Sequence, residues 1–382
     1  MHIAYLTPEF PHDRIGGSGG MGTSIKNLVN ELVKNKVKVS VFVYGQKSAG
    51  HFEENGINFY LLKQIQYPFG GFYLYRKHIN RFLNRYIECE GIDLLEVPDW
   101  TGITAFMTFK IPVVMRFHGS DTYFCHIEGR QQKWKNRFFE KQAVRNAVGY
   151  IAPTHFAGKE SARLFNMDHN QIEVIPYGLV LADFENPNPQ EYKPYALLNI
   201  GTLIRKKGVF ELVDIFNQMI ELEPRTTLTF IGSDSKDIKT GSSSTWALMQ
   251  EHMSAKAKTQ IAYKGKVPYD QVRQEILKAH VCVFPSLAET LGMVTIESMA
   301  LQKAVVNTNI GWAQDIMDHG VDGFMHHPSE TDQFVKSIKT VFDNPALVSQ
   351  LGAKARKKVE AKFDIQRTVE KNLYYYRNLL NK

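Results

Sequence analysis

The sequence predicts an α/β protein built of two similar lobes, each with a parallel sheet covered by helices. Three observations predict this. The chain has 382 residues, more than one ordinary domain of ~100–200 residues. In both halves, short β-branched or aromatic runs alternate with helix-periodic segments. A polar segment with two prolines, residues 185–190, interrupts the alternation. Strands and helices that take turns form a parallel sheet with helices on its faces.

The first lobe is expected to span residues 1–184. Its strand predictions rest on β-branched and aromatic runs, and its helix predictions on apolar residues spaced three and four apart. The predicted strands are 2–7, 38–44, 57–62, 92–95, 113–117, 149–152 and 172–176, and the predicted helices are 23–35, 73–89, 101–108, 131–147 and 155–164.

An interdomain linker is expected at 185–194, followed by a second α/β lobe at 195–362. Its predicted strands are 195–200, 227–231, 260–264, 280–284 and 304–308, with helices at 209–221, 245–256, 269–278, 293–302 and 312–318. From 331 onward the pattern is helical. The last helix, 363–382, has wide apolar coverage and is expected to return to the first lobe.

Composition points to a compact soluble protein with real cores, because 43% of residues are hydrophobic and 22% are charged. The three cysteines are far apart and lack metal-ligand spacing, which favours a reducing, cytoplasmic setting. The first residues lack the basic region of a signal peptide, and no stretch reaches roughly 18 apolar residues, so we expect neither secretion nor a spanning helix.

The net charge is +7, with most of the excess in the N-terminal half. Such a surplus attracts anionic lipid, phosphate or nucleic acid, although a modest surplus is more often ordinary solubility charge. No recognised nucleic-acid-binding module is present, and no nucleic-acid partner is expected.

A glycine-rich loop, Gly17 to Gly22, precedes the helix expected near Thr23 and matches the spacing of a dinucleotide-binding turn. It lies about ten residues beyond the first strand, and the second strand ends in Gly45-Gln46 without an acidic residue for a ribose. Both facts disfavour a nicotinamide site. Backbone N–H groups at such a loop can still receive a phosphate or a sugar hydroxyl, and a flexible surface loop is an equal alternative.

Two glutamates follow a buried strand of the second lobe. Glu289 falls on the loop after Val281–Phe284, and Glu297 falls about one turn into the next helix. Ligands of open α/β sheets bind beyond the carboxyl ends of strands, and the amides of Gly292, Met293 and Val294 open between the two carboxylates. Carboxylates suit sugar hydroxyls and helix-start amides suit a diphosphate, as in a nucleotide diphosphate sugar. Two solvated surface charges remain the alternative.

Cations follow the first strand of the second lobe. The loop Gly201 to Gly208 contains Arg205, Lys206 and Lys207, which can neutralise a leaving diphosphate. No Asp-x-Asp motif offers a metal for that task, so no metal is expected. In the first lobe, His118 ends another strand, where a neutral imidazole can orient a sugar hydroxyl or merely satisfy local hydrogen bonds.

Together these segments resemble the retaining glycosyltransferase family 4, also described as glycosyl transferases group 1. The resemblance spans nearly the whole chain. It is carried by the glycine loop at 16–22, His118-Gly119, Ile175-Pro176-Tyr177-Gly178, Lys207-Gly208, Ile231-Gly232, Phe284-Pro285-Ser286, the pair Glu289 and Glu297, and Asn309-Ile310-Gly311.

The resemblance implies the GT-B fold, two facing Rossmann-like lobes with a donor cleft between them and a C-terminal helix crossing back. It implies that Glu297 binds the donor ribose, Glu289 the transferred sugar and Lys207 the diphosphate. It also implies that His118 contacts the sugar near the reacting carbon. Donor-binding backbone is implied at Gly19, Gly20, Gly201, Gly292, Met293 and Val294.

The sequence departs from the family pattern at three positions. Thr202 stands where the family usually has an arginine, and we hypothesise that Arg205 supplies the missing cation. Leu291 replaces a phenylalanine. Trp312 replaces a glycine with a large ring, which puts acceptor access near that loop in doubt.

The implied reaction is transfer of a hexose-type sugar from a donor such as a UDP- or GDP-sugar, with retention at the anomeric carbon. The diphosphate leaves toward Lys207, the acceptor attacks from the same face, and no protein nucleophile or cofactor takes part. Closure of the cleft would keep water from competing with the acceptor. Cell-surface polysaccharide or glycolipid synthesis is the expected setting.

A saccharide or lipid-linked acceptor is expected to enter from the first lobe. Asp99, Trp100 and Asp121 are the candidate acceptor residues, although Trp100 fits a core position equally well. Basic amphipathic helices near 73–89 and 131–147 could dock on the inner face of an anionic membrane, and a solvated face over core aromatics is the alternative.

Two other classes of function compete. A nucleotide-sugar epimerase or phosphorylase of the same fold would turn over without a saccharide acceptor or with orthophosphate. A non-catalytic nucleotide-sugar-binding protein would bind without turnover, but it has less need for Lys207 beside a leaving group.

Overall fold

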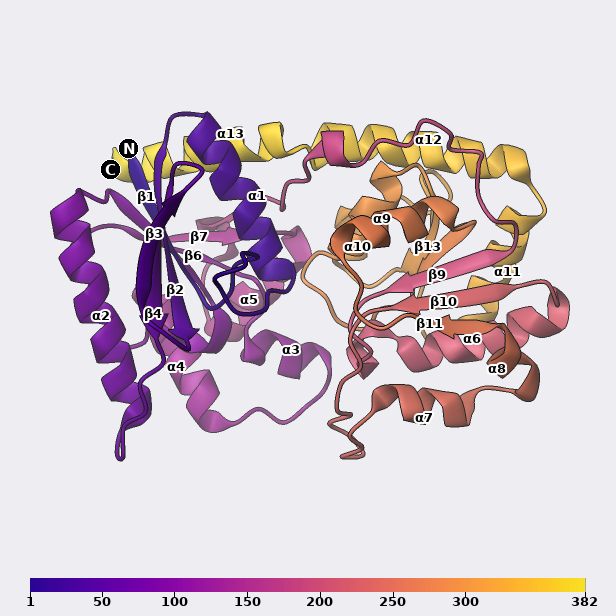
Figure 1. Ribbon diagram of the computed structural model, residues 1–382, viewed down its shortest axis with the longest axis horizontal. Helices are drawn as coiled ribbons and strands as arrows, with labels where there is room; N and C mark the ends of the chain where they lie inside the picture. The colour runs from indigo at the N-terminus through magenta and orange to yellow at the C-terminus, as the bar shows by residue number, and fades with distance from the viewer. Residues whose placement is uncertain (382) are drawn as a thin grey trace. The chain divides into compact units, whose positions relative to one another are not determined.

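The computed structural model describes residues 1–381 and divides the chain into two compact units, coloured from indigo to yellow along the sequence in Figure 1. Unit 1 comprises Met1–Leu179 together with the segment from Asp364 onward, and unit 2 comprises Val180–Phe363. Residues 185–194, expected as a linker, are part of unit 2. The side-chain amide of Asn186 donates to the carbonyl of Leu301 (2.7 Å), and the Lys193 N–H donates to the carbonyl of Lys278 (2.9 Å).

Unit 1 contains an eight-stranded sheet in the order β3-β4-β2-β1-β5-β6-β7-β8, parallel except where β3 pairs with β4. The strands are β1 (His2–Thr7), β2 (Lys38–Gln46), β3 (Gly50–Glu54), β4 (Ile57–Lys63), β5 (Leu94–Pro98), β6 (Val113–Arg116), β7 (Gly149–Ala152) and β8 (Ile172–Val174). The helices are α1 (Gly20–Lys34), α2 (Gly71–Glu90), η1 (Trp100–Gly102), α3 (Asp121–Ile127), α4 (Trp134–Arg145), α5 (His155–Phe165), η2 (His169–Gln171) and α13 (Ile365–Leu380).

Both faces of this sheet are buried, as the continuous apolar strands require. Along β1, Ile3 and Tyr5 face the cluster that includes α1 and α13, whereas Ala4 and Leu6 face the cluster that includes α2. This alternation is the two-residue period of a strand buried on both faces.

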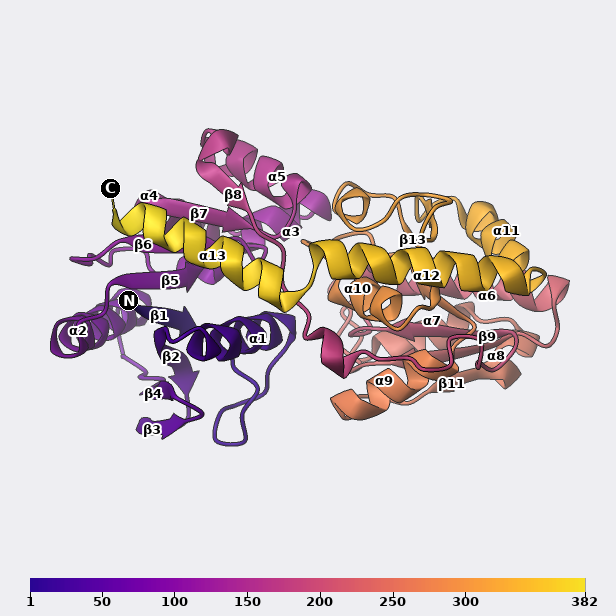
Figure 2. The ribbon, with the colours of Figure 1, turned by 90° about the horizontal axis from the view of Figure 1, so that it is seen from above.

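Helix α13 lies beside α1 on unit 1, as Figure 2 shows. It contacts a buried ion pair between Arg116 and Glu96 (2.7 Å), which lie on neighbouring strands. Arg116 donates to the side chain of Asn372 (2.5 Å), and the Tyr376 hydroxyl donates to Glu96 (2.5 Å). The carboxylate of Glu96 raises the pKa of Arg116 further, in spite of its desolvation. The helix is thus attached by buried polar contacts as well as by apolar packing.

Unit 2 contains a six-stranded parallel sheet in the order β11-β10-β9-β12-β13-β14, with helices on both faces in Figure 1. The strands are β9 (Ala196–Ile200), β10 (Thr227–Ile231), β11 (Ile261–Tyr263), β12 (Val281–Phe284), β13 (Ala304–Thr308) and β14 (Phe324–His326). The helices are η3 (Leu181–Asp183), η4 (Arg205–Lys207), α6 (Val209–Leu222), α7 (Thr245–His252), α8 (Ala255–Gln260), α9 (Tyr269–Lys278), α10 (Met293–Ala300), η5 (Ala313–Asp315), α11 (Thr331–Phe342) and α12 (Pro345–Lys362).

The strand order makes both units Rossmann-like. In unit 2 the first strand, β9, lies between β10 and β12, so the order reverses at the β9–β12 boundary. Such a switch point is where open α/β sheets bind ligands. Within residues 1–381, no helix combines the length and the apolar character needed to cross a bilayer.

Some elements differ from the sequence expectation. The helix expected at 101–108 is a short turn, η1, because Thr101, Gly102 and Phe106 have positive φ angles (56°, 56° and 63°) that no helix accepts. The helix expected at 312–318 is only η5. The segments β3, β14 and α3 were not expected. The helix after the glycine loop begins at Gly20 rather than near Thr23.

Candidate functional site

Two loops of unit 2 meet at the carboxyl ends of β9 and β12. The N–H groups of Leu287 and Ala288 both donate to the carbonyl of Lys206 (2.8 and 3.1 Å). Gly208 has φ +67°, and a Cβ added to it would lie 1.8 Å from the carbonyl oxygen of Pro285. Only glycine allows this approach. The basic loop (residues 201–208) and the glutamate loop (residues 285–292) therefore form one rigid edge.

This contact places two predicted site residues together. Lys207 and Glu289 form an ion pair, with side chains 21% and 16% exposed. Both charges are therefore partly hydrated and accessible to a ligand. A diphosphate and a sugar hydroxyl can each take over one partner of this pair, which is the chemistry predicted for Lys207 and Glu289.

Glu297 lies in the second turn of α10 and is buried, with 6% exposure. The hydroxyl of Tyr269, the first residue of α9, donates to its carboxylate (2.6 Å). Burial raises the pKa of Glu297 to about 7, although the hydrogen bond from Tyr269 opposes the shift. Sequence reasoning missed Tyr269, although its place at a helix start after β11 puts it at the same sheet edge.

The raised pKa of Glu297 predicts a pH dependence of donor binding. Ribose hydroxyls donate to a carboxylate better than to a carboxylic acid, so donor affinity should fall as pH drops below about 7, by up to about ten-fold per pH unit. Glu297→Gln should weaken binding and remove this dependence. Calorimetric titration with a nucleotide sugar at several pH values measures both effects.

Stability should change in the opposite direction. The folded-state pKa of Glu297 lies above the unfolded value of 4.5, so the stabilisation from the protonated form is complete below that value and is lost as pH rises through about 7. The difference in unfolding temperature between native protein and Glu297→Gln should follow this trend. A difference that does not vary with pH would contradict the assignment. Comparing the two proteins cancels the contribution of Asp99, whose pKa burial also raises to about 7.

The start of α10 supplies the predicted backbone site. Gly292 precedes the helix with φ +91°, and Met293 and Val294 are partly exposed in its first turn. First-turn amides have no carbonyl four residues earlier in the helix, and the helix dipole favours an anion there. Gly201 follows β9 directly, with φ +150°, and lies beside Gly232, where an added Cβ would lie 1.9 Å from the Gly201 carbonyl oxygen.

Arg205 pairs with an acidic residue, Asp237, that sequence reasoning missed. Its guanidinium makes a two-point contact with Asp237 (2.7 and 3.1 Å) and lies over the ring of Phe210, 4.3 Å from its centre. This contact lowers the pKa of Asp237 to about 2, and Thr240 also donates to the carboxylate. The Arg205 side chain is 35% exposed, so its charge is shared between Asp237 and solvent.

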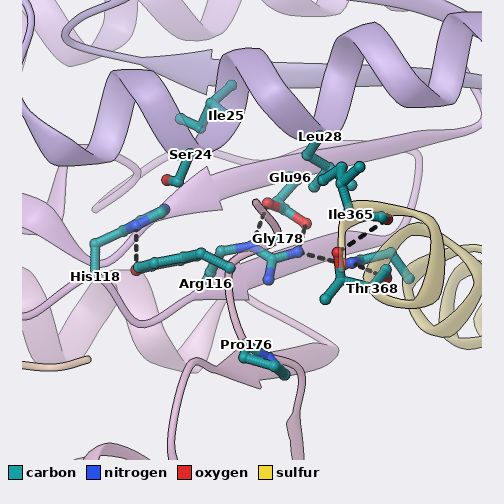
Figure 3. Close-up of a pocket in the computed structure, with 12 residues that line it drawn as sticks. Ser24, Ile25, Leu28, Glu96, Arg116, His118, Pro176, Gly178, Ile365 and Thr368 are labelled. Carbon is teal, nitrogen blue, oxygen red and sulfur yellow. Dashed lines mark hydrogen bonds and ion pairs between the residues drawn. The ribbon is translucent and has the colours of Figure 1, made fainter. Parts of the chain in front are cut away.

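In unit 1, His118 follows β6 and lines a pocket with Ser24 and Thr368 (Figure 3). Its Nδ1 lies 2.7 Å from the Tyr177 hydroxyl, and the two rings stack with centres 5.4 Å apart. Burial and the Arg116 charge lower the pKa of His118 to about 3. The ring is neutral, and with Tyr177 as donor its proton lies on Nε2, which can donate to a ligand.

In Tyr177→Phe, His118 is expected to lose the hydrogen bond that fixes its proton on Nε2, so that both tautomers become populated. Removing one hydrogen bond should cost about 1 kcal/mol of stability. If His118 assists transfer, turnover should fall about ten-fold with little change in the donor KM. Imidazole ¹⁵N shifts should report a mixture of tautomers. A single unchanged tautomer in the variant would refute the positioning role of Tyr177.

Asp99 and Asp121, predicted to bind an acceptor, contact other parts of unit 1. Asp99 is buried, and its carboxylate accepts the N–H groups of His118 (2.9 Å) and Gly119 (3.2 Å). Asp121 begins α3 and accepts from the side chain of Asn136 (2.9 Å). Asp99 therefore shapes the His118 loop, while Trp100 is 39% exposed at the surface.

The glycine loop of unit 1 is occupied by a side chain of the protein. Gly19 and Gly20 are exposed at the start of α1, and Glu9 accepts the N–H of Gly22 (2.7 Å). A Cβ on Gly19 would lie 3.5 Å from the Glu9 carboxylate. The carboxylate of Glu9 thus neutralises part of the positive dipole field at the N-terminus of α1. Sequence reasoning missed this residue.

Trp312, which replaces the usual glycine, is buried, with 1% exposure. Its ring belongs to the core of unit 2 and does not project from the loop. Leu291 is buried as well. Within residues 1–381, no group of three or more His, Cys, Asp or Glu side chains is arranged to hold a metal ion.

Two Rossmann-like units, one with a cation and carboxylates at its switch point, define a GT-B glycosyltransferase. Family comparison agrees: "Glycosyltransferase Family 4" matches residues 18–183 and "Glycosyl transferases group 1" matches residues 182–358. The chain belongs to this glycosyltransferase family and is a transferase enzyme.

Relatives and solved structures are similar along most of the chain. A glycosyltransferase of Methanocaldococcus jannaschii is 21% identical, covering 99% of this chain and 98% of the relative. Glycogen synthase of Mycobacterium tuberculosis is 24% identical, covering 72% and 66%. Sucrose-phosphate synthase from Thermosynechococcus elongatus superimposes with a TM-score of 0.82 at 19% identity, covering 100% and 99%. HepE from Anabaena, solved with UDP and glucose, gives 0.77 at 16% identity, covering 99% and 100%.

Proposed function

We propose that the protein transfers a hexose-type sugar, with retention, from a nucleotide diphosphate sugar to a saccharide or lipid-linked acceptor. The ion pair of Lys207 and Glu289 at the β9–β12 switch point carries this proposal, because it sets a leaving-group cation beside a carboxylate for sugar hydroxyls. Glu297, with Tyr269, would hold the ribose, and the amides of Met293 and Val294 would contact sugar and phosphate.

The nature of the donor is supported by similar proteins. HepE from Anabaena has been solved with UDP-glucose, and a starch synthase from Arabidopsis thaliana with ADP. UDP-, ADP- and GDP-sugars are therefore the donors to test first. Relatives named for teichuronic acid and capsular polysaccharide biosynthesis support a role in cell-surface polysaccharide or glycolipid synthesis.

We further propose that the reaction needs no metal, since Lys207 supplies positive charge where the diphosphate leaves. His118, neutral and backed by Tyr177, would donate to the sugar. No protein nucleophile is assigned, so the acceptor would attack from the face that the diphosphate leaves. Activity at the inner face of the membrane follows from this proposal if the acceptor is lipid-linked.

A donor screen followed by product analysis tests this function. We expect one class of nucleotide sugar to raise the unfolding temperature, and turnover to require an acceptor and to persist in excess EDTA. The anomeric proton of the first product should show the donor configuration by NMR. Turnover without an acceptor, or with orthophosphate alone, would replace transfer by epimerase or phosphorylase activity; stabilisation without turnover would indicate a binding protein.

A further inference from the structure

Unit 1 carries an exposed aromatic surface that the proposed site does not use. We call it the aromatic ledge. Phe69 is 89% exposed and Trp134 is 73% exposed, values that are unusual for such large apolar side chains. The ledge consists of Phe69, Phe72, Tyr73, Phe106, Trp134 and Phe138.

Ring contacts join three segments of the chain into this ledge. The ring of Phe106, on the loop after η1, lies 5.6 Å from that of Tyr73 on α2 and 6.1 Å from that of Phe138 on α4. Trp134 lies one turn before Phe138 on the same face of α4. The rings of α2, the loop after η1 and α4 therefore form a continuous patch, and Phe69 is exposed on the loop just before α2. On a soluble surface such a patch usually marks an interaction site.

Arg76 is buried behind the ledge and connects its segments. Its guanidinium donates to the carbonyls of Phe72 (2.9 Å), Thr101 (3.0 Å) and Gly102 (3.2 Å), and it lies over the ring of Phe139, 4.7 Å from its centre. Phe106 is held at φ +63°, a conformation rare for an aromatic residue. A strained backbone that presents an apolar ring to solvent is a feature of functional surfaces.

Positive charge continues from the ledge along both helices. On α4, the only acidic residue of the helix, Glu140, is buried and accepts the N–H groups of Asp121 and Thr122, so its exposed face is neutral and basic. On α2, the basic residues follow Tyr73 at intervals of four. The exposed basic residues are Lys77, Arg81 and Arg85 on α2, and Lys133, Lys135, Arg137, Lys141 and Arg145 at α4.

We propose that the aromatic ledge and these basic rows dock on the surface of an anionic phospholipid bilayer. Aromatic rings favour the boundary between headgroups and acyl chains, and lysine and arginine favour the phosphates beside them. The inference deepens and rests on the proposed function, since it brings the enzyme to a lipid-linked acceptor. Binding to lipid itself requires no turnover.

Flotation of the full chain with vesicles tests the proposal. The native protein should bind vesicles that contain phosphatidylglycerol, bind pure phosphatidylcholine vesicles weakly, and dissociate at high salt. Lys141→Glu with Arg145→Glu should weaken binding roughly 30-fold or more, since each basic residue near an anionic surface contributes about five-fold. Trp134→Ser with Phe138→Ser should weaken it by about ten-fold.

Matched changes elsewhere serve as controls. Lys354→Glu with Lys357→Glu, on the exposed face of α12, and Tyr374→Ser, 71% exposed on α13, should leave vesicle binding unchanged. Unfolding temperatures show whether each variant folds. Native protein that does not float with anionic vesicles overturns the proposal, and so do folded ledge variants that bind as well as native. If the native protein is a dimer that does not bind lipid, and the ledge variants are monomers, the proposal is overturned and the ledge instead binds a second copy of the chain. Vesicle binding without sugar transfer would instead refute the proposed function alone.

Discussion

Lys207→Ala is expected to lower turnover about 100- to 1,000-fold, the usual effect of removing one group that stabilises a developing charge. The ammonium of Lys207 is the cation paired with Glu289 at the β9–β12 edge, and both side chains are partly hydrated. The variant should therefore fold normally. Turnover at saturating donor and the shift in unfolding temperature with donor separate loss of chemistry from loss of binding.

Arg205→Ala is the companion to this variant. It leaves Asp237 buried without its guanidinium, so its unfolding temperature should fall, unlike that of Lys207→Ala. If Arg205 supplies the cation missing at Thr202, turnover should also fall. Unchanged turnover in Arg205→Ala, with turnover abolished in Lys207→Ala, would restrict Arg205 to holding the loop.

Gly208→Ala is expected to destabilise unit 2 by more than about 3 kcal/mol. The new Cβ would lie 1.8 Å from the Pro285 carbonyl oxygen, at a backbone φ of +67° that disfavours any side chain. The two loops would have to separate, which would move Lys207 away from Glu289. Urea unfolding measures the stability, and donor titration of the remaining folded protein measures the damage to the site.

Gly241→Ala isolates the backbone part of this effect. Gly241 has a similar φ of +79°, but nothing lies within 4 Å of an added Cβ. Its substitution should cost only about 1 kcal/mol. Similar losses for Gly208→Ala and Gly241→Ala would show that the approach of Pro285 is not what requires glycine at position 208.

Most strands and long helices could be predicted because their apolar patterns repeat. The exceptions depend on contacts made from far away. Ile103, Phe106 and Met107 have the three- and four-residue spacing of a helical pattern, but Gly102 lies against the backbone of Phe139, and the chain turns instead. The N–H groups at the start of α3 donate to the carboxylate of Glu140. Glu140 is 19 positions from Asp121, so this contact cannot be anticipated from local sequence.

The site could be predicted where strand order determines it. Glu289 and Lys207 follow strands that became neighbours, so the rule for the carboxyl ends of parallel strands was enough to suggest a shared ligand. Partners reached by side chains were not foreseen. Asp237 and Glu9 come from other loops and Tyr269 from the start of α9, and they determine how Arg205, the glycine loop and Glu297 are held.

The attachment of α13 to unit 1 has a consequence for biosynthesis. The ribosome makes every residue of unit 2 before it makes Asn372 and Tyr376, which cover the Arg116–Glu96 pair. Unit 2 is continuous in sequence and can fold first. Until α13 is made, the Arg116–Glu96 pair and an apolar face of the N-terminal unit remain exposed to solvent. The N-terminal unit should therefore be exposed to chaperones and proteases for the time needed to translate roughly half the chain. In a pulse-labelling experiment, the N-terminal unit should become resistant to protease after unit 2 does.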